Sequence, residues 1–280
     1  MKKFIVEQIV PIALTILTFF TLSTVLYGVL LFINSFLLQD NQVILDFRKR
    51  DVLIGIAVYL KTAIDFAIFI GNLMRTNPGW KKRIAIEIGT AVGNAFGTFL
   101  VLTVWIFFRQ VPILMAIMIF IASIILLRMA QESLEEFLKQ KKSFIKMRMP
   151  VYLLQSQLDF INRIFRPVLG FFVPDLKLTR AKKLTFTNLI VFSFTIPFVL
   201  GLDDFAGYIS LFSVINVFGF AIGVLLGHMF LNIGLFIYPK MTVRIVTHPF
   251  VLIGGGFAFI ALGLWGIIET VKLLISLFVH

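Results

Sequence analysis

Long apolar stretches, separated by short polar or charged segments, dominate the sequence. Seven of them are long enough to be transmembrane helices, since about 20 apolar residues in a helix span a hydrocarbon core of about 30 Å. The predicted spans are residues 9–38, 52–74, 84–108, 111–127, 184–212, 216–238 and 249–278. The pattern therefore predicts an all-α polytopic membrane protein with seven transmembrane helices. Spans longer than required would tilt or break.

The composition supports this prediction and excludes several other classes. Of the 280 residues, 59% are hydrophobic and 14% are charged, whereas about 25% of residues are charged in an ordinary soluble domain. A soluble enzyme, a disordered protein and a fibrous protein are therefore excluded. There is no cysteine, which excludes disulfides and thiolate metal sites. Because no phosphate-binding loop or hydrolase motif is found, we expect neither an enzyme nor a bound cofactor.

The formal net charge is +12, and its distribution predicts the orientation of the chain. With seven spans, twenty Lys and Arg residues fall on one side of the membrane and four on the other. The positive-inside rule then places the N-terminus and the basic loop 128–183 in the cytoplasm of a cell-membrane protein, with the C-terminus outside. We expect this loop to attract anionic lipids, and we expect no nucleic-acid partner.

After the first span, the sequence divides into two similar units of three spans. Residues 63–67 in the second span resemble residues 202–206 in the fifth. Since three is an odd number, the two copies have opposite orientations, as in many transporters. The predicted organisation is an N-terminal helix with its outer loop (1–51), a first repeat (52–134), a basic loop (135–183) and a second repeat (184–280).

The middle span of each unit carries glycines four residues apart. These glycines either pack helices closely, in one chain or in a homodimer, or shape a central site. They are Gly89, Gly93 and Gly97 in the third span and Gly219, Gly223 and Gly227 in the sixth.

Ionisable and amide side chains inside apolar spans are costly, so they mark candidate sites. Lys61 lies one helical turn before Asp65 and either neutralises it in a structural pair or occupies an empty cation position. His228 is either a hydrogen-bond partner between helices or a ligand and proton carrier. Oxygen and nitrogen ligands suit manganese, magnesium, calcium or protons. The candidate metal ligands are Asp65, Asp203, Asp204, His228, Asn94, Asn232 and Glu269.

Four local expectations accompany these sites. Pro197 can break the fifth span before its aspartates, or the span ends near Leu202 and both aspartates lie in water. Glu87, near the start of the third span, is expected to reach interfacial water. Glu269 and Lys272 are three residues apart and can pair. Residues 149–174 predict an amphipathic helix, which either lies on the inner membrane surface or packs on the transmembrane helices.

Several short motifs resemble one known group of membrane proteins. They are Lys61-Thr-Ala-Ile-Asp65-Phe66, the basic turn 75–83, Leu202-Asp203-Asp204, and Leu252-Ile-Gly-Gly-Gly256 running on to Glu269. Together they resemble the lysine-exporter superfamily, and especially its TerC family, over residues 52–278 outside the central loop.

The resemblance implies export of small ions, notably manganese, with Asp65 and Asp204 or Asp203 at the interface of the repeats. TerC members tend to have Asp-Asn and an acidic residue six positions earlier. This chain has Asp65-Phe66 and Asp204-Phe205 instead, preceded by Tyr59 and Phe198.

Three functional hypotheses follow. The first is a secondary transporter that exports a divalent cation, with manganese as the main candidate, driven by protons or the membrane potential. The second is an exporter of another solute such as an amino acid, in which Lys61 contacts a carboxylate. The third is a non-transporting scaffold that acts through the cytoplasmic loop.

Overall fold

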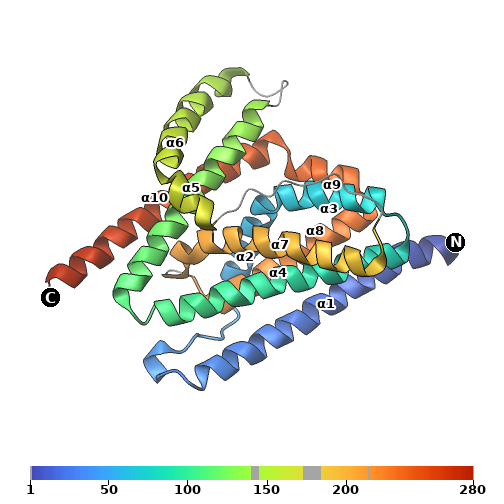
Figure 1. Cartoon of the computed structure of the whole chain (residues 1–280), viewed down its shortest axis with the longest axis horizontal. Coiled ribbons are helices and arrows are strands. Elements are labelled where there is room, and N and C mark those ends of the chain that lie inside the picture. Colours follow the sequence, from blue (N-terminus) through green and yellow to red (C-terminus); the bar gives the residue numbers. More distant parts are fainter. Residues whose placement is uncertain (1, 140–144, 173–183, 214, 280) are drawn as a thin grey trace. The chain divides into compact units, whose positions relative to one another are not determined.

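The structure is a computed structural model that describes residues 2–139, 145–172, 184–213 and 215–279 (Figure 1). Every regular element in these ranges is a helix. The α-helices are α1 (Lys2–Asn34), α2 (Lys49–Thr62), α3 (Ile64–Thr76), α4 (Trp80–Phe108), α5 (Pro112–Lys139), α6 (Ile145–Phe172), α7 (Phe186–Tyr208), α8 (Val217–Ile237), α9 (Pro239–Val246) and α10 (Pro249–Val279), and the short 3₁₀ helices are η1 (Gln39–Asn41) and η2 (Ile209–Ser213).

The chain forms two compact units. Unit 1 comprises residues 1–102, 177–202 and 215–246, and unit 2 comprises residues 103–176, 203–214 and 247–280. Within the described ranges, five helices are long and apolar enough to cross a membrane, namely α1, α4, α5, α8 and α10. The bent pair α2 and α3 adds a sixth if it counts as one span. The all-α membrane class is confirmed, and the total of seven spans stays a prediction.

The second predicted span is divided, whereas the fifth is continuous where a break was predicted. α2 ends at Thr62 and α3 begins at Ile64, with a bend of 64° between the helices. Lys61 and Asp65 therefore lie on different helices. The break predicted at Pro197 is wrong, because α7 runs through this residue to Tyr208. An interior proline removes one backbone hydrogen bond, and here the neighbouring turns keep the helix intact.

In unit 1, α2 and α8 pack with their backbones in contact. A methyl group placed on Gly223 would lie 2.2 Å from the carbonyl oxygen of Val52 and 2.9 Å from Cα of Gly55. Since real side chains do not come this close, only glycine fits here. One turn further on, Gly227 leaves room for the ring of Tyr59. The contacts advance in the same direction along both helices, so α2 and α8 are parallel.

The helices α4 and α7 pack in the same way within unit 1. A methyl group on Gly89 or Gly93 would lie 2.5 or 2.3 Å from the carbonyl oxygen of Ile190 or Phe194. The register repeats as well. The carbonyl oxygens that face Gly89 and Gly93 belong to Ile190 and Phe194, and those that face Gly219 and Gly223 belong to Arg48 and Val52, which lie 142 residues earlier in both cases. The prediction that glycines pack helices is confirmed for Gly89, Gly93, Gly219, Gly223 and Gly227, which helices of the same chain cover, and it stays a prediction for Gly97. Association of two chains through them stays a prediction.

In unit 2, α5 packs against α10 in the antiparallel sense. Gly256 of α10 contacts Leu134 of α5, and Gly263 contacts Leu127 and the carbonyl oxygen of Ser123. As the residue number rises in α10, the contacted number falls in α5. Small residues again permit the close approach of two apolar helices.

The predicted amphipathic segment forms α6, which packs on α5 as a hairpin (Figure 1). Val151 and Leu158 are buried, and Arg148 donates from Nη2 to the carbonyl oxygen of Leu138 at 2.7 Å. Packing on a transmembrane helix is therefore confirmed for one face of α6. The other face exposes large apolar side chains, among them Met149 and Phe160.

Candidate functional site

Glu87 is fully buried in unit 1, so the expectation that it reaches interfacial water is wrong. Its position along α4 places it near the start of the helix, but side chains from α1 and α8 cover it. It belongs to a buried polar stripe of α4, at spacings of three and four residues. The stripe consists of Glu87, Thr90, Asn94 and Thr98.

Both oxygens of the Glu87 carboxylate accept hydrogen bonds from other helices. Thr18 of α1 donates from Oγ1 to Oε1 at 3.0 Å. Asn232 of α8 donates from Nδ2 to Oε2 at 2.8 Å, and the same nitrogen lies 3.2 Å from Oγ1 of Thr90. The carboxylate thus joins three helices that are distant in the sequence.

The chain of contacts continues through His228 to Tyr59. Nε2 of His228 lies 3.0 Å from Nδ2 of Asn232, and Nδ1 lies 2.8 Å from the hydroxyl oxygen of Tyr59. The Asn232 amide nitrogen has two hydrogens for three neighbours, and where it donates to Nε2 that ring nitrogen accepts. Nδ1 then carries the single ring proton and donates it to Tyr59. In this arrangement the imidazole is neutral.

These contacts define one cluster in unit 1, with members from α1, α2, α4 and α8. In the described part of the chain, no lysine or arginine contacts its carboxylate, and every hydrogen-bond partner of Glu87 is neutral. The arrangement can bind a small cation, or it can hold a proton within a hydrogen-bonded chain. The Glu87 cluster consists of Thr18, Tyr59, Glu87, Thr90, His228 and Asn232.

The structure brings together only some of the predicted site residues. His228 and Asn232 lie in the Glu87 cluster, so the hydrogen-bonding role of His228 is confirmed. Asn94 is buried two turns along α4 from Glu87, and its Nδ2 has no hydrogen-bond partner among the described residues. Lys61 is buried in α2.

The remaining candidates lie in unit 2 or have side chains outside the described residues. Glu269 belongs to α10 in unit 2 and pairs with Lys272, with 3.6 Å between Oε2 and Nζ. This expected pair is confirmed. The side chains of Asp65, Asp203 and Asp204 lie outside the described residues. Among the residues that are described, no group of three or more His, Cys, Asp or Glu side chains could hold a metal ion.

Sequence reasoning missed Glu87, Tyr59, Thr18 and Thr90. Glu87 and Thr90 carry a signal that could have revealed them, because they share the polar stripe of α4 with Asn94. A stripe of this kind inside an apolar span indicates a face that is turned away from lipid. Thr18 carries no such signal, since it is one of several hydroxyl residues in an apolar helix.

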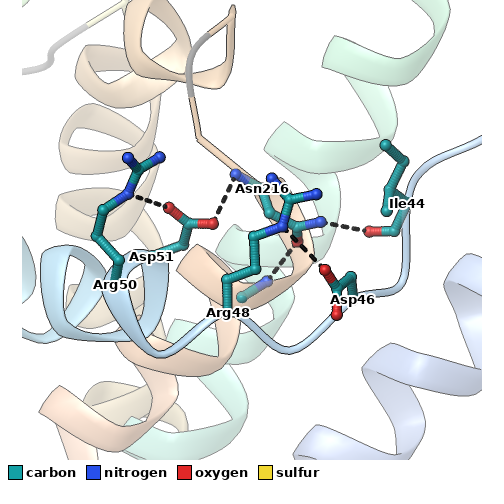
Figure 2. A network of polar contacts seen from close by, with 7 residues as sticks. Ile44, Asp46, Arg48, Arg50, Asp51 and Asn216 are labelled. Atoms are coloured by element: carbon teal, nitrogen blue, oxygen red, sulfur yellow. Dashed lines mark hydrogen bonds and ion pairs between the residues drawn. The ribbon is translucent and has the colours of Figure 1, made fainter.

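A second polar cluster joins the N-terminal ends of α2 and α8 (Figure 2). The carboxylate of Asp51 is completely buried and accepts a hydrogen bond from the backbone N–H of Asn216 at 3.1 Å. Arg50 approaches its other oxygen at 3.4 Å. The Asn216 side chain caps α8 by accepting from the backbone N–H of Gly219, and it donates to the carbonyl oxygen of Ile44. These contacts join the N-terminal ends of two helices that are already in backbone contact.

The chain was also compared with known proteins. No protein family, characterised protein or solved structure matches it. The function is therefore argued from the buried cluster and the packing of the helices.

Proposed function

We propose that this chain is a secondary transporter that moves a small cation across the membrane, with the Glu87 cluster as an ion-binding site. One observation carries this proposal: a fully buried carboxylate hydrogen-bonds only to neutral side chains. A buried carboxylate without a compensating charge is costly inside a membrane protein, and such groups often mark ion pathways. A bound cation supplies the missing charge.

The helix packing supports an inverted-repeat architecture for this transporter. In the predicted repeat, α2 corresponds to α7 and α4 corresponds to α8. The pairs α2·α8 and α4·α7 each join the first helix of one copy to the second helix of the other, and their registers are the same. The third helices of the two copies, α5 and α10, pack on each other. This pattern is expected of two copies related by a twofold axis.

The proposed cargo and its direction rest on the family resemblance. The resemblance to the TerC family implies manganese export, with Asp65 and Asp204 or Asp203 as ligands. We keep this as the proposed cargo site, separate from the Glu87 cluster. The distribution of basic residues predicts that the N-terminus lies in the cytoplasm, and the driving force would be an ion gradient or the membrane potential.

Flux into proteoliposomes tests the proposal. Purified wild-type protein is expected to take up manganese or sodium above the level of protein-free vesicles. Glu87→Gln keeps the size of the side chain but removes its charge, so it should lower the flux at least tenfold. Glu132→Gln is the matched control, because Glu132 pairs with Arg128 at a partly exposed position of α5 and should retain the flux.

Two outcomes would overturn this function. Absence of flux for manganese, calcium, cadmium and sodium in the wild type would leave the organic-solute and scaffold hypotheses. Equal flux in Glu87→Gln and the wild type would remove the Glu87 cluster from the transport pathway. A variant that lacks residues 149–174 separates the remaining two hypotheses, since only the scaffold depends on that segment.

A further inference from the structure

The charge balance of the Glu87 cluster limits the ion that it can bind. Glu87 supplies one negative charge, and His228 is neutral in the hydrogen-bonding pattern described above. Thr18, Thr90 and Asn232 are neutral as well. A monovalent cation would make the cluster neutral overall. A divalent cation would leave one uncompensated positive charge among buried groups, and charges of that kind are strongly disfavoured.

The available ligand atoms are mainly oxygens, which hard cations prefer. Glu87 contributes its carboxylate, and Thr18 and Thr90 contribute hydroxyl oxygens that lie next to it or to Asn232. Oδ1 of Asn232 is buried and has no hydrogen-bond partner among the described residues. An unpartnered buried carbonyl is costly, so this oxygen indicates a missing ligand.

A half-turn of the Asn232 amide would place Oδ1 where Nδ2 lies now. The oxygen would then be about 2.8 Å from Oε2 of Glu87, 3.2 Å from Oγ1 of Thr90 and 3.0 Å from Nε2 of His228. In that arrangement Nε2 carries the single ring proton and donates to Oδ1, and Nδ1 accepts from the hydroxyl of Tyr59, so the imidazole stays neutral. Three oxygens this close repel one another unless a cation lies between them or Glu87 holds a proton, and at pH 8 a metal cation can compete with that proton. The half-turn therefore converts a hydrogen-bonded cluster into a set of cation ligands.

We infer that the Glu87 cluster binds one monovalent metal cation, of which sodium is the representative. The inference rests on the proposed function in one respect only, namely that the bound sodium ion drives transport of the cargo. Manganese would remain the cargo, at the separate aspartates. Binding itself can be measured without transport.

The experiment measures thermal unfolding of the purified full-length protein in detergent at pH 8. Intrinsic tryptophan fluorescence reports the midpoint, and choline chloride keeps the ionic strength constant as sodium is added. A ligand that binds only the folded protein raises the midpoint as its concentration rises. We expect a sodium-dependent rise in the wild type and none in Glu87→Gln. Thr90→Val removes one hydroxyl oxygen at similar volume. We expect this variant to need about ten times more sodium than the wild type for the same rise in the midpoint, because one ligand is lost.

Three results would contradict sodium binding at the Glu87 cluster. A sodium response that is unchanged in both variants would overturn it, as would no response up to a few hundred millimolar. A response to manganese instead, lost in Glu87→Gln, would establish a divalent site and overturn it. Flux without sodium binding would leave the proposed function standing, whereas sodium binding without any flux would reject that function and keep the site. Glu132→Gln should respond like the wild type.

Discussion

The two glycine-packed pairs of unit 1, α2·α8 and α4·α7, share one register but differ in their polar side chains. In α2·α8, a methyl group on Gly223 would meet a backbone carbonyl at 2.2 Å, and in α4·α7 one on Gly93 would do so at 2.3 Å. The polar groups of the first pair have mostly apolar counterparts in the second. At the offsets of the packing contacts, the counterparts of Asp51, Tyr59, Asn216, His228 and Asn232 are Ser193, Gly201, Ile86, Thr98 and Leu102.

The difference shows that packing and chemistry are independent in this chain. Backbone contact through glycine is used twice, at equivalent positions. The hydrogen bond between Tyr59 and His228 joins α2 to α8, and Asn232 of α8 connects His228 to Glu87 of α4. Equal packing predicts that the two pairs are equally destabilised by added volume. The unequal polar contacts predict that loss of polar groups destabilises α2·α8 more than α4·α7.

Adding a methyl group to the glycines should give the largest effect. Gly223→Ala and Gly93→Ala each place Cβ against a backbone carbonyl that cannot move without shifting its helix. Overpacking typically costs about 1–3 kcal/mol. We expect the unfolding midpoint to fall by several degrees in both variants and by similar amounts. Tryptophan fluorescence in detergent measures it.

Gly28→Ala is the control for this comparison, because nothing lies within 4 Å of the added Cβ. It should leave the midpoint unchanged or raise it, since alanine favours the helix. If only one of the two packed glycines were sensitive, the shared register would not reflect equal packing, and the proposed repeat would lose its main support.

Removing the Asp51 carboxylate should have the next largest effect, in α2·α8 alone. Asp51→Ala leaves the buried N–H of Asn216 without its acceptor, which costs about 1–3 kcal/mol. Asp51→Asn retains an oxygen acceptor and should cost less. The midpoint of unfolding is the measurement. A fall no greater than that of Asp46→Ala, an exposed acid on the same segment, would show that the buried hydrogen bond contributes little.

The packing was more predictable from the sequence than the site was. The spacing of Gly219, Gly223 and Gly227 indicated close helix contact, but a spacing cannot name the partner helix. The break at Ala63 has no proline or glycine beside it, so no local pattern indicates it. Pro197 does provide such an indication, yet α7 continues through it.

The site depended on neighbours that sequence periodicity does not reveal. The depth of Glu87 was judged from its distance to the start of its span, whereas its burial results from Thr18 and Asn232 on other helices. His228 and Asn232 were identified because they are polar residues one turn apart in an apolar span. Their connection to Glu87 is a tertiary contact, and no pattern within one helix contains it.

The exposed ion pair beside Asp51 should give the smallest effect. Arg48 donates from Nε to Asp46 at 2.9 Å, with about half of each side chain exposed. This hydrogen bond, together with the charge of Asp46, raises the pKa of Arg48 above its ordinary high value. A raised pKa of a base stabilises the fold below the unfolded-state pKa, and that stabilisation is lost only as the pH rises through the folded-state value. Both values lie far above pH 9, so Arg48 stays charged between pH 6 and pH 9.

Arg48→Ala should therefore leave the unfolding midpoint unchanged within error at pH 6 and at pH 9, and 0.5 M salt should make no difference to the comparison with the wild type. Asp46→Ala is expected to behave in the same way. A fall in the Arg48 variant as large as that of Asp51→Ala would mean that the exposed pair helps to hold the ends of α2 and α8 together. In that case the contrast between the two helix pairs would arise from surface charge as well as from buried hydrogen bonds, and salt should then weaken the α2·α8 pair selectively.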